Sequence, residues 1–208
     1  NKFRIRNCGG RVMYKILILA GGYSNEREIS LITAKSVIQE LKKNKKYRIL
    51  LIEPDGSFVK KLRKFKPNLV LNLLHGRYGE DGYIQSILES EKVKYSHSGV
   101  LSSSLAIDKE LSKKIFIKNN ILTPRYIKFS FQNKFNKKNI IKKIDKYLKF
   151  PVVLKPINEG SSVGVFICNK KNFNINLMKL EKFKDILIEK YIPGREIQAA
   201  ILGKKKTR

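Results

Sequence analysis

The chain has 208 residues, of which 42% are hydrophobic, so it can bury a core in one large or two small domains and is not a disordered chain. Its 45 lysines and arginines outnumber 17 acidic residues, giving a formal charge of +28, which raises nucleic acid or an anionic surface as a partner. The lysines are scattered over polar helix faces among many Ile and Asn residues, however, so we expect a solvated surface and no specific nucleic-acid partner.

Cysteine usage and hydropathy bear on the compartment. Cys8 and Cys168 are far apart and show neither metal-ligand spacing nor a disulfide framework, which favours a reducing compartment. The apolar run at residues 16–20 is too short to span a membrane, and the basic start lacks the apolar region of a signal peptide. We therefore expect a cytoplasmic protein without a membrane partner. Residues 1–12 are polar and aperiodic, and we assign this extension no fold.

The chain after Met13 alternates between strand and helix patterns. Apolar runs at residues 15–20, 49–52 and 69–74 predict strands, and the third is apolar enough to be buried on both faces. Between them, a helical pattern follows Gly21-Gly22, with Leu31, Ala34, Ile38 and Leu41 on one face, and Phe58–Phe65 reads as a short helix. This alternation predicts an α/β domain over residues 13–105, with a parallel sheet between helices.

A glycine-rich loop follows the third predicted strand and opens with His75. It reads H-G-R-Y-G-E-D-G, with three glycines and two acids in eight residues, and a helix is predicted after it at residues 83–91. Ligands of parallel sheets sit at the carboxyl ends of the strands, so this loop and the Gly21 turn should share one rim. His75 is therefore a candidate site residue, although a structural role is equally compatible with the sequence.

The pattern changes after Gly99, and we set the domain boundary near residue 105. Ile107, Leu111 and Ile115 repeat at helical spacing, and this helix should end near residues 119–120. Beyond it we expect an extended segment at residues 126–129, a helix at 139–148, a strand at 186–188 and a short strand at 197–202. Residues 106–192 thus form a small α+β unit, and residues 193–208 begin a further one.

Residues 155–164 read K-P-I-N-E-G-S-S-V-G and lie between apolar runs at 150–154 and 163–167, which predicts two strands flanking a Gly/Ser loop. The glycines permit unusual backbone conformations, and hydroxyls and amides there can surround an anion beside the charge of Lys155. A plain turn would explain the glycines alone. It would not explain why Glu159, Ser161 and Ser162 are gathered beside Lys155. We therefore interpret the loop as a phosphate-binding site. Its sequence matches neither the Walker A motif nor the Rossmann fingerprint.

Five segments, in this order, resemble those of D-alanine-D-alanine ligases of the ATP-grasp superfamily. They are G-G-Y-S-N-E-R-E-I-S from Gly21, H-G-R-Y-G-E-D-G from His75, D-K at Asp108, K-P-I-N-E-G-S-S-V-G from Lys155 and E-K-Y-I-P-G-R-E from Glu189. Each segment alone is a weak signal. Their order and intervals make a specific one, which covers nearly all of residues 13–202.

The resemblance implies a fold and a reaction. The fold would be a Rossmann-like domain at residues 13–105, followed by the small α+β lobe of an ATP-grasp domain at 106–192, with a second lobe that is mostly missing and begins at 193–208. The reaction would be ATP-dependent ligation for peptidoglycan synthesis: ATP phosphorylates one D-alanine, and the amine of a second attacks the acyl phosphate. The resemblance also suggests a homodimer.

The resemblance assigns roles on the substrate side and to two lysines. Glu26 would bind the ammonium of the first D-alanine by a charge-assisted hydrogen bond, and its alternative role is to complement the helix dipole. His75 would lie beside the carboxylate of the same substrate. Lys109 and Lys155 would hold ATP phosphates, although Lys109 could also be a plain surface lysine.

The remaining roles concern loop closure and the nucleoside. Ser161 and Ser162 would close over the phosphates and exclude water, with Glu159 orienting the loop. The adenine would be read by backbone groups of a strand segment, and Glu196 would accept hydrogen bonds from the ribose. A plain core strand is the alternative for that segment, which consists of Glu189, Lys190, Tyr191 and Ile192.

The family also uses Mg²⁺, whose ligands lie in a final domain that runs on for roughly a hundred residues, the size of an ordinary module. This sequence stops before them. We therefore expect ATP and Mg²⁺ as cofactors but no metal ligand within these 208 residues. The corresponding hypothesis is a fragment, or a frame-shifted product, that cannot catalyse the reaction alone.

Three alternatives remain open at this point. Another ATP-grasp carboxylate-amine ligase is opposed by the E-R-E-I-S and H-G-R-Y-G-E-D-G segments, which belong to the substrate side. A non-enzymatic basic nucleic-acid-binding module would show clustered arginines with exposed aromatic residues, whereas the lysines here are diffuse. A degenerate or regulatory homologue without activity is the third.

Overall fold

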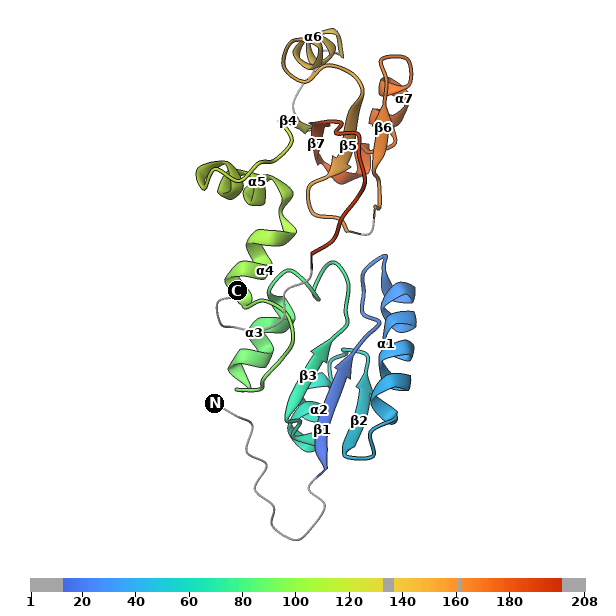
Figure 1. The fold of residues 1–208 in the computed structure, drawn as a ribbon, viewed down its shortest axis with the longest axis vertical. Coiled ribbons are helices and arrows are strands. Elements are labelled where there is room, and N and C mark those ends of the chain that lie inside the picture. Colours follow the sequence, from blue (N-terminus) through green and yellow to red (C-terminus); the bar gives the residue numbers. More distant parts are fainter. Residues whose placement is uncertain (1–12, 133–136, 161, 200–208) are drawn as a thin grey trace.

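The computed structural model describes residues 13–132, 137–160 and 162–199. Figure 1 shows two units, one built on a three-stranded sheet and the other on a four-stranded sheet, with two consecutive helices between them. Residues 1–12, 133–136, 161 and 200–208 lie outside the described residues. None of the helices within the described ranges is long and apolar enough to cross a membrane.

The first unit contains the predicted parallel sheet. β1 (Tyr14–Leu19) lies between β2 (Tyr47–Ile52) and β3 (Leu69–Asn72), and both neighbours run parallel to it. β3 ends two residues before its predicted end, because the side-chain oxygen of Asn72 accepts a hydrogen bond from the backbone N–H of Leu74 (3.2 Å) and turns the chain.

Helices cover both faces of this sheet, as the alternation of strand and helix patterns predicts. Side chains of β1 point alternately to the two faces, so Ile16 and Ile18 pack against α1 (Arg27–Lys42), and Leu17 and Leu19 pack on the opposite side. That opposite side is covered by α2 (Phe58–Phe65) and α3 (Tyr83–Ser90). Both faces of β1 are therefore buried, and the carboxyl ends of the strands are left for the loops of the site.

The prediction of a single helix after residue 105 is wrong. Two helices are present, α4 (Val100–Ile107) and α5 (Lys109–Lys118), and the sequence did not predict α4. They are separated at Asp108, which has an extended backbone and accepts a hydrogen bond from the N–H of Leu111 (2.9 Å), so that it caps α5. The predicted boundary near residue 105 falls within α4.

The apolar repeat used to predict α5 is not its buried face. Leu111 and Ile115 are 39% and 38% exposed, and the buried residue of α5 is Lys113. The helix therefore packs a charged side chain inward, which apolar periodicity cannot reveal.

The second unit has an antiparallel sheet in the order β4-β7-β5-β6. Its strands are β4 (Tyr126–Ser130), β5 (Val152–Pro156), β6 (Phe166–Cys168) and β7 (Asp185–Lys190). β5 and β6 confirm the two strands predicted on either side of the Gly/Ser loop. Residues 197–199 do not form the predicted short strand, and the rest of that segment lies outside the described residues.

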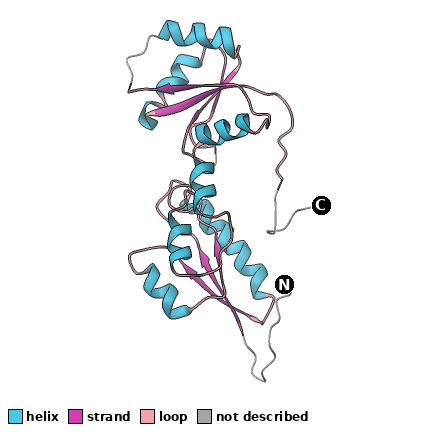
Figure 2. Ribbon diagram, turned by 90° about the vertical axis from the view of Figure 1, so that its left-hand side faces the viewer, coloured by secondary structure: helices cyan, strands magenta, loops and turns pink. Residues whose placement is uncertain are grey.

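One face of the second sheet is covered by α6 (Lys137–Tyr147) and α7 (Phe173–Met178), with a 3-10 turn at Glu181–Phe183. The sequence predicted α6 but neither α7 nor the 3-10 turn. The core between the helices and the sheet includes Ile144, Leu148, Phe173, Ile186 and Ile188. After β7 the chain runs as a loop back toward the first unit (Figures 1 and 2).

Candidate active site

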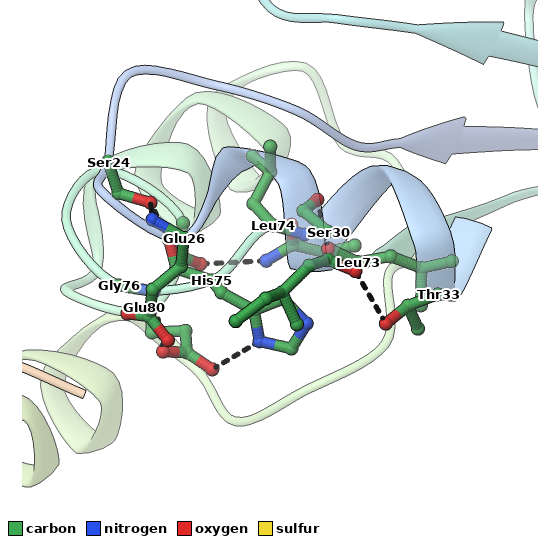
Figure 3. Close-up of polar contacts among 12 residues, drawn as sticks. Ser24, Glu26, Ser30, Thr33, Leu73, Leu74, His75, Gly76 and Glu80 are labelled. Atoms are coloured by element: carbon green, nitrogen blue, oxygen red, sulfur yellow. Dashed lines mark hydrogen bonds and ion pairs between the residues drawn. The ribbon is translucent and has the colours of Figure 1, made fainter. Parts of the chain in front are cut away.

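The loops that follow β1 and β3 share one rim, as predicted. The backbone N–H of Gly21 donates to Ser30 Oγ (2.8 Å), and that hydroxyl donates to the carbonyl of Leu73 at the end of β3 (2.6 Å). Ser24 Oγ donates to the carbonyl of His75 (2.8 Å). The start of α1 is thereby tied directly to the His75 loop, and Figure 3 shows Ser24, Glu26 and His75 gathered at this junction.

Glu26 immediately precedes α1, and its backbone N–H donates to Ser24 Oγ (3.2 Å). Its side chain makes no capping hydrogen bond and is only 4% exposed. Among the described residues, no donor or cation forms a hydrogen bond or ion pair with its carboxylate. A buried carboxylate without a counter-ion is costly, so this arrangement favours binding of a cationic ligand over the capping role.

Two glycines make room for the Glu26 carboxylate. A Cβ at Gly76 would lie 2.6 Å from Glu26 Oε2, and a Cβ at Gly160 would lie 3.0 Å from the same atom. Gly76 also has a φ of +66°, which side chains rarely adopt. The carboxylate therefore lies between the His75 loop of the first unit and the loop that follows β5 in the second.

The imidazole of His75 faces Glu80, which belongs to the same loop and which the sequence did not single out. Nδ1 of His75 lies 3.8 Å from Glu80 Oε1, while Glu80 Oε2 accepts a hydrogen bond from the N–H of Gly76 (2.8 Å; Figure 3). Nε2 of His75 is buried and has no hydrogen-bond partner within the described residues. A second histidine, His97, lies near this pair, and burial lowers its pKa.

A cavity of about 600 Å³ opens at this rim, a volume suited to a small ligand. His75, Gly22 and Leu74 contribute to its wall. Three tyrosines border it and contact one another edge to face, with ring centroids 6.5 Å apart for Tyr23 and Tyr78 and 5.3 Å apart for Tyr78 and Tyr83. The ligand edge predicted at the carboxyl ends of the parallel strands therefore coincides with a cavity.

The second cluster brings together three of the predicted residues, Lys109, Lys155 and Glu189. Lys155 in β5 extends its ammonium to Glu189 Oε2 of the neighbouring strand β7 (2.7 Å). Lys109, the first residue of α5, lies close enough to Lys155 for the two positive charges to repel each other. Burial lowers the pKa of Lys109, and the charge of Lys155 lowers it further.

A third lysine completes this cluster, and the sequence analysis missed it. Lys113 Nζ lies 2.9 Å from Glu189 Oε1, on the carboxylate oxygen that Lys155 does not contact. The only signal in the sequence is its spacing, since residues four apart lie on the same side of a helix and Lys113 is four residues after Lys109.

The loop after β5 connects the two clusters. Lys109 donates from its backbone N–H to the carbonyl of Ile157 (3.2 Å), and from Nζ to the carbonyls of Ile157 (3.3 Å) and Glu159. Glu159 thus meets Lys109 through its backbone and not through its carboxylate. The next residue, Gly160, lies against Glu26. Two consecutive loop residues therefore contact the lysine cluster and the Glu26 carboxylate.

The other predicted site residues are less closely involved. Ser162 is exposed with a φ of +61°, and Ser161 lies outside the described residues. Lys190 is exposed at the end of β7, and the N–H of Tyr191 donates to the carbonyl of Pro151 (3.3 Å). Ile192 and Glu196 are exposed, and Glu196 forms no hydrogen bond or ion pair with another described residue.

The described part of the chain contains no cluster of metal ligands. Among its His, Cys, Asp and Glu side chains, no group of three or more is arranged to hold a metal ion. Mg²⁺ is usually held by one or two carboxylates together with substrate phosphates, and the described residues do not form a protein cage for it.

Comparisons with known proteins agree on one family. A model described as "D-ala D-ala ligase C-terminus" matches residues 115–208. The D-alanine-D-alanine ligase of Pelagibacter ubique (strain HTCC1062) is 61% identical over 191 residues, which are 92% of this chain and 62% of that protein. The corresponding ligase of Carboxydothermus hydrogenoformans is 42% identical over 191 residues, covering 91% and 61% of the two chains.

Solved structures agree with these sequence matches. The D-alanine-D-alanine ligase of Bacillus anthracis has a TM-score of 0.73 and 37% identity, over 86% of this chain and 58% of that one. A structure of the Bacillus anthracis ligase complexed with ATP has a TM-score of 0.72 and 33% identity, over 87% and 60%. The chain thus spans about three fifths of the length of these relatives. In its sequence and in its combination of a parallel and an antiparallel sheet, this chain is similar to D-alanine-D-alanine ligases over about three fifths of their length.

Proposed function

We propose that this chain forms part of an ATP-dependent ligase that joins two D-alanine molecules. The observation that carries the proposal is the contact of one loop with two differently charged sites: Glu159 meets Lys109, and Gly160 meets Glu26. A cationic group bound by Glu26 and a phosphate bound by the lysines would be neighbours. That is the requirement for phosphorylating a carboxylate of an amino acid held by its ammonium.

The first step transfers the terminal phosphoryl group of ATP to the carboxylate of the first D-alanine. Glu26 binds the ammonium of this substrate, and Nε2 of His75 faces its carboxylate end. Lys109 and Lys155 bind the phosphates and offset the negative charge that spreads over the transferring group. The products of this step are ADP and D-alanyl phosphate.

In the second step the neutral amine of the second D-alanine attacks the carbonyl carbon of the acyl phosphate. A tetrahedral intermediate forms and collapses, the C–O bond to phosphate breaks, and the attacking nitrogen loses a proton. The products are the dipeptide and inorganic phosphate. Closure of the loop that contains Ser161 and Ser162 would keep water from hydrolysing the acyl phosphate first.

The finer assignments belong to the same proposal. Residues 13–105 would be the substrate-side domain, residues 106–192 the small lobe of an ATP-grasp domain, and residues 193–208 the start of its second lobe. Backbone groups of residues 189–192 would read the adenine, and Glu196 would bind the ribose. Magnesium would accompany ATP with ligands supplied by other residues, and a cytoplasmic homodimer making a peptidoglycan precursor remains our expectation.

The proposal is tested first by binding. In isothermal titration calorimetry, the 208-residue chain should bind ATP in competition with ADP and should bind D-alanine in preference to L-alanine. A fusion that adds the remaining two fifths of the Pelagibacter ubique relative should release ADP only when D-alanine is present. A chain that binds no nucleotide, together with a fusion whose ADP release is indifferent to D-alanine, would contradict the proposed function.

A further inference from the structure

Lys113 is a buried lysine whose ammonium lies among three oxygen atoms. It is 5% exposed. Nζ donates hydrogen bonds to Thr123 Oγ1 (2.8 Å) and to the carbonyl of Pro124 (2.9 Å). It also forms an ion pair with Glu189 Oε1 (2.9 Å), which makes no hydrogen bond within the described residues. Lys113 is therefore held by protein groups and is shielded from solvent.

Glu189 is equally enclosed, and its two carboxylate oxygens serve different lysines. The residue is 5% exposed, with Oε1 facing Lys113 and Oε2 facing Lys155 (2.7 Å). The two lysines differ in their access to solvent. The side chain of Lys155 is 23% exposed and that of Lys113 is 6% exposed, so only Lys155 can turn outward from the shared carboxylate.

The charges explain why a second lysine is needed. With Glu189 alone opposite it, Lys155 would be held in a neutral pair, and moving it to a phosphate would leave a buried carboxylate without a partner. Lys113 adds a positive charge on the far side of Glu189, so the three groups sum to one positive charge. Lys109 is close enough to sense Lys155, and with it the cluster is doubly positive.

We propose that Lys113 is a positioning residue that keeps Glu189 paired while Lys155 exchanges this carboxylate for a phosphate of the bound nucleotide. The inference rests on the proposed ATP site and deepens it. Lys113 acts through Glu189 and Lys155 and touches no substrate itself. Burial lowers the pKa of Lys113, and the ion pair with Glu189 opposes this shift.

The test separates phosphate binding from nucleoside binding. In Lys113→Met, Glu189 retains Lys155 as its only ion-pair partner within the described residues, so ATP affinity should fall by about tenfold or more while adenosine affinity stays unchanged. The matched control is Lys114→Met, which removes the neighbouring lysine. The Lys114 side chain is 57% exposed and pairs with Glu110 (2.8 Å), so its loss should change neither affinity.

A double variant tests the charge balance itself. Lys113→Met combined with Glu189→Gln removes the competing carboxylate together with its counter-ion, and Lys155 is then free for phosphate. The ratio of ATP affinity to adenosine affinity should return to near the wild-type value. Lys113→Arg should preserve that ratio, because arginine keeps the positive charge. A purely structural role of Lys113 would not produce recovery on removing a second buried group.

The outcomes are distinguishable. Equal losses of ATP and adenosine affinity in Lys113→Met would overturn the inference and leave the proposed function intact. So would failure of the double variant to recover the ratio when urea unfolding shows that it is folded. A wild-type chain that binds neither ligand would contradict the proposed function and the inference together.

Discussion

The carboxylate of Glu26 lies 3.0 Å from the point at which a side chain on Gly160 would begin. The two residues come from loops that follow strands of different sheets. The carbonyl of the preceding residue, Glu159, accepts a hydrogen bond from Lys109 Nζ. One short segment therefore lies against both the Glu26 carboxylate and the lysine cluster.

Replacing Glu26 by Gln removes the buried charge without changing the size of the side chain. A hydrogen bond to a charged group contributes about 1.5–3 kcal/mol, so D-alanine affinity should fall by about 10- to 100-fold, with ATP affinity unchanged. Calorimetric titration with each ligand measures both values. Glu28→Gln is the control, since Glu28 lies two residues further on, in the first turn of α1, and its side chain is 82% exposed. Unchanged D-alanine affinity in Glu26→Gln would remove the assigned role.

Gly160→Ala tests the close approach itself. The φ of Gly160 is outside the left-handed region, so alanine fits the backbone, but its Cβ would meet both carboxylate oxygens of Glu26, at 3.0 and 3.4 Å. The loop must then shift by a few tenths of an ångström, and D-alanine affinity should fall several-fold, corresponding to about 1 kcal/mol. Gly56→Ala, where no atom lies within 4 Å of the new Cβ, should leave affinity unchanged. Equal effects at both positions would show that the approach is immaterial.

The pH dependence of ATP affinity should report on Lys109. Burial and the charge of Lys155 lower the pKa of Lys109 from its usual 10.5, so the ammonium loses its proton at a lower pH than a free lysine does. Phosphate binding requires the charged form of Lys109. ATP affinity should therefore fall as the pH rises, and the fall should start at a pH lower than the usual lysine pKa of 10.5. In Lys109→Arg the decline should become smaller, because arginine stays charged while Lys113, whose pKa is also lowered by burial, still titrates. A decline of the same size and midpoint in that variant would assign it to another group.

Ile188 anchors the strand that carries Glu189. It is fully buried in the core of the second unit, and Ile188→Ala should lower the free energy of unfolding by about 2–5 kcal/mol, through lost burial and the cavity left behind. Ile192→Ala, at a position that is 58% exposed, should change it by less than about 0.5 kcal/mol. Urea unfolding followed by circular dichroism measures both. A loss for Ile188→Ala as small as that for Ile192→Ala would show that this core does not hold β7.

Much of the architecture could be read from the sequence because local sterics and burial decide it. The apolar runs of β1 and β3 and the Gly-Gly turn predicted the parallel sheet, and the Lys155 loop was correctly predicted to lie between two strands. The shared rim followed from strand direction alone, since the carboxyl ends of parallel strands meet at one edge. His75 and Lys155 were singled out from these loops, whereas Glu26 and Lys109 came from the resemblance to the ligases.

Two of the misses concern α5, where polar contacts override the apolar pattern. Asp108 divides α4 from α5 by capping, although the apolar repeat continues across it. Lys113 is buried instead of Leu111 or Ile115, because Glu189 on β7 supplies a counter-ion that compensates for loss of water. No spacing within α5 contains that information.

The sequence by itself determined the alternation of strands and helices in the first unit, the glycine-rich loops and the residue types of the site, because these depend on the conformations and burial open to each short segment. Only the tertiary structure decided which charges meet. Glu189 became the carboxylate shared by Lys113 and Lys155, and Glu26 came to lie beside Gly160, when the two sheets and α5 packed together. Electrostatic energy depends on distance in space and on exclusion of water, and neither is written in the order of the residues.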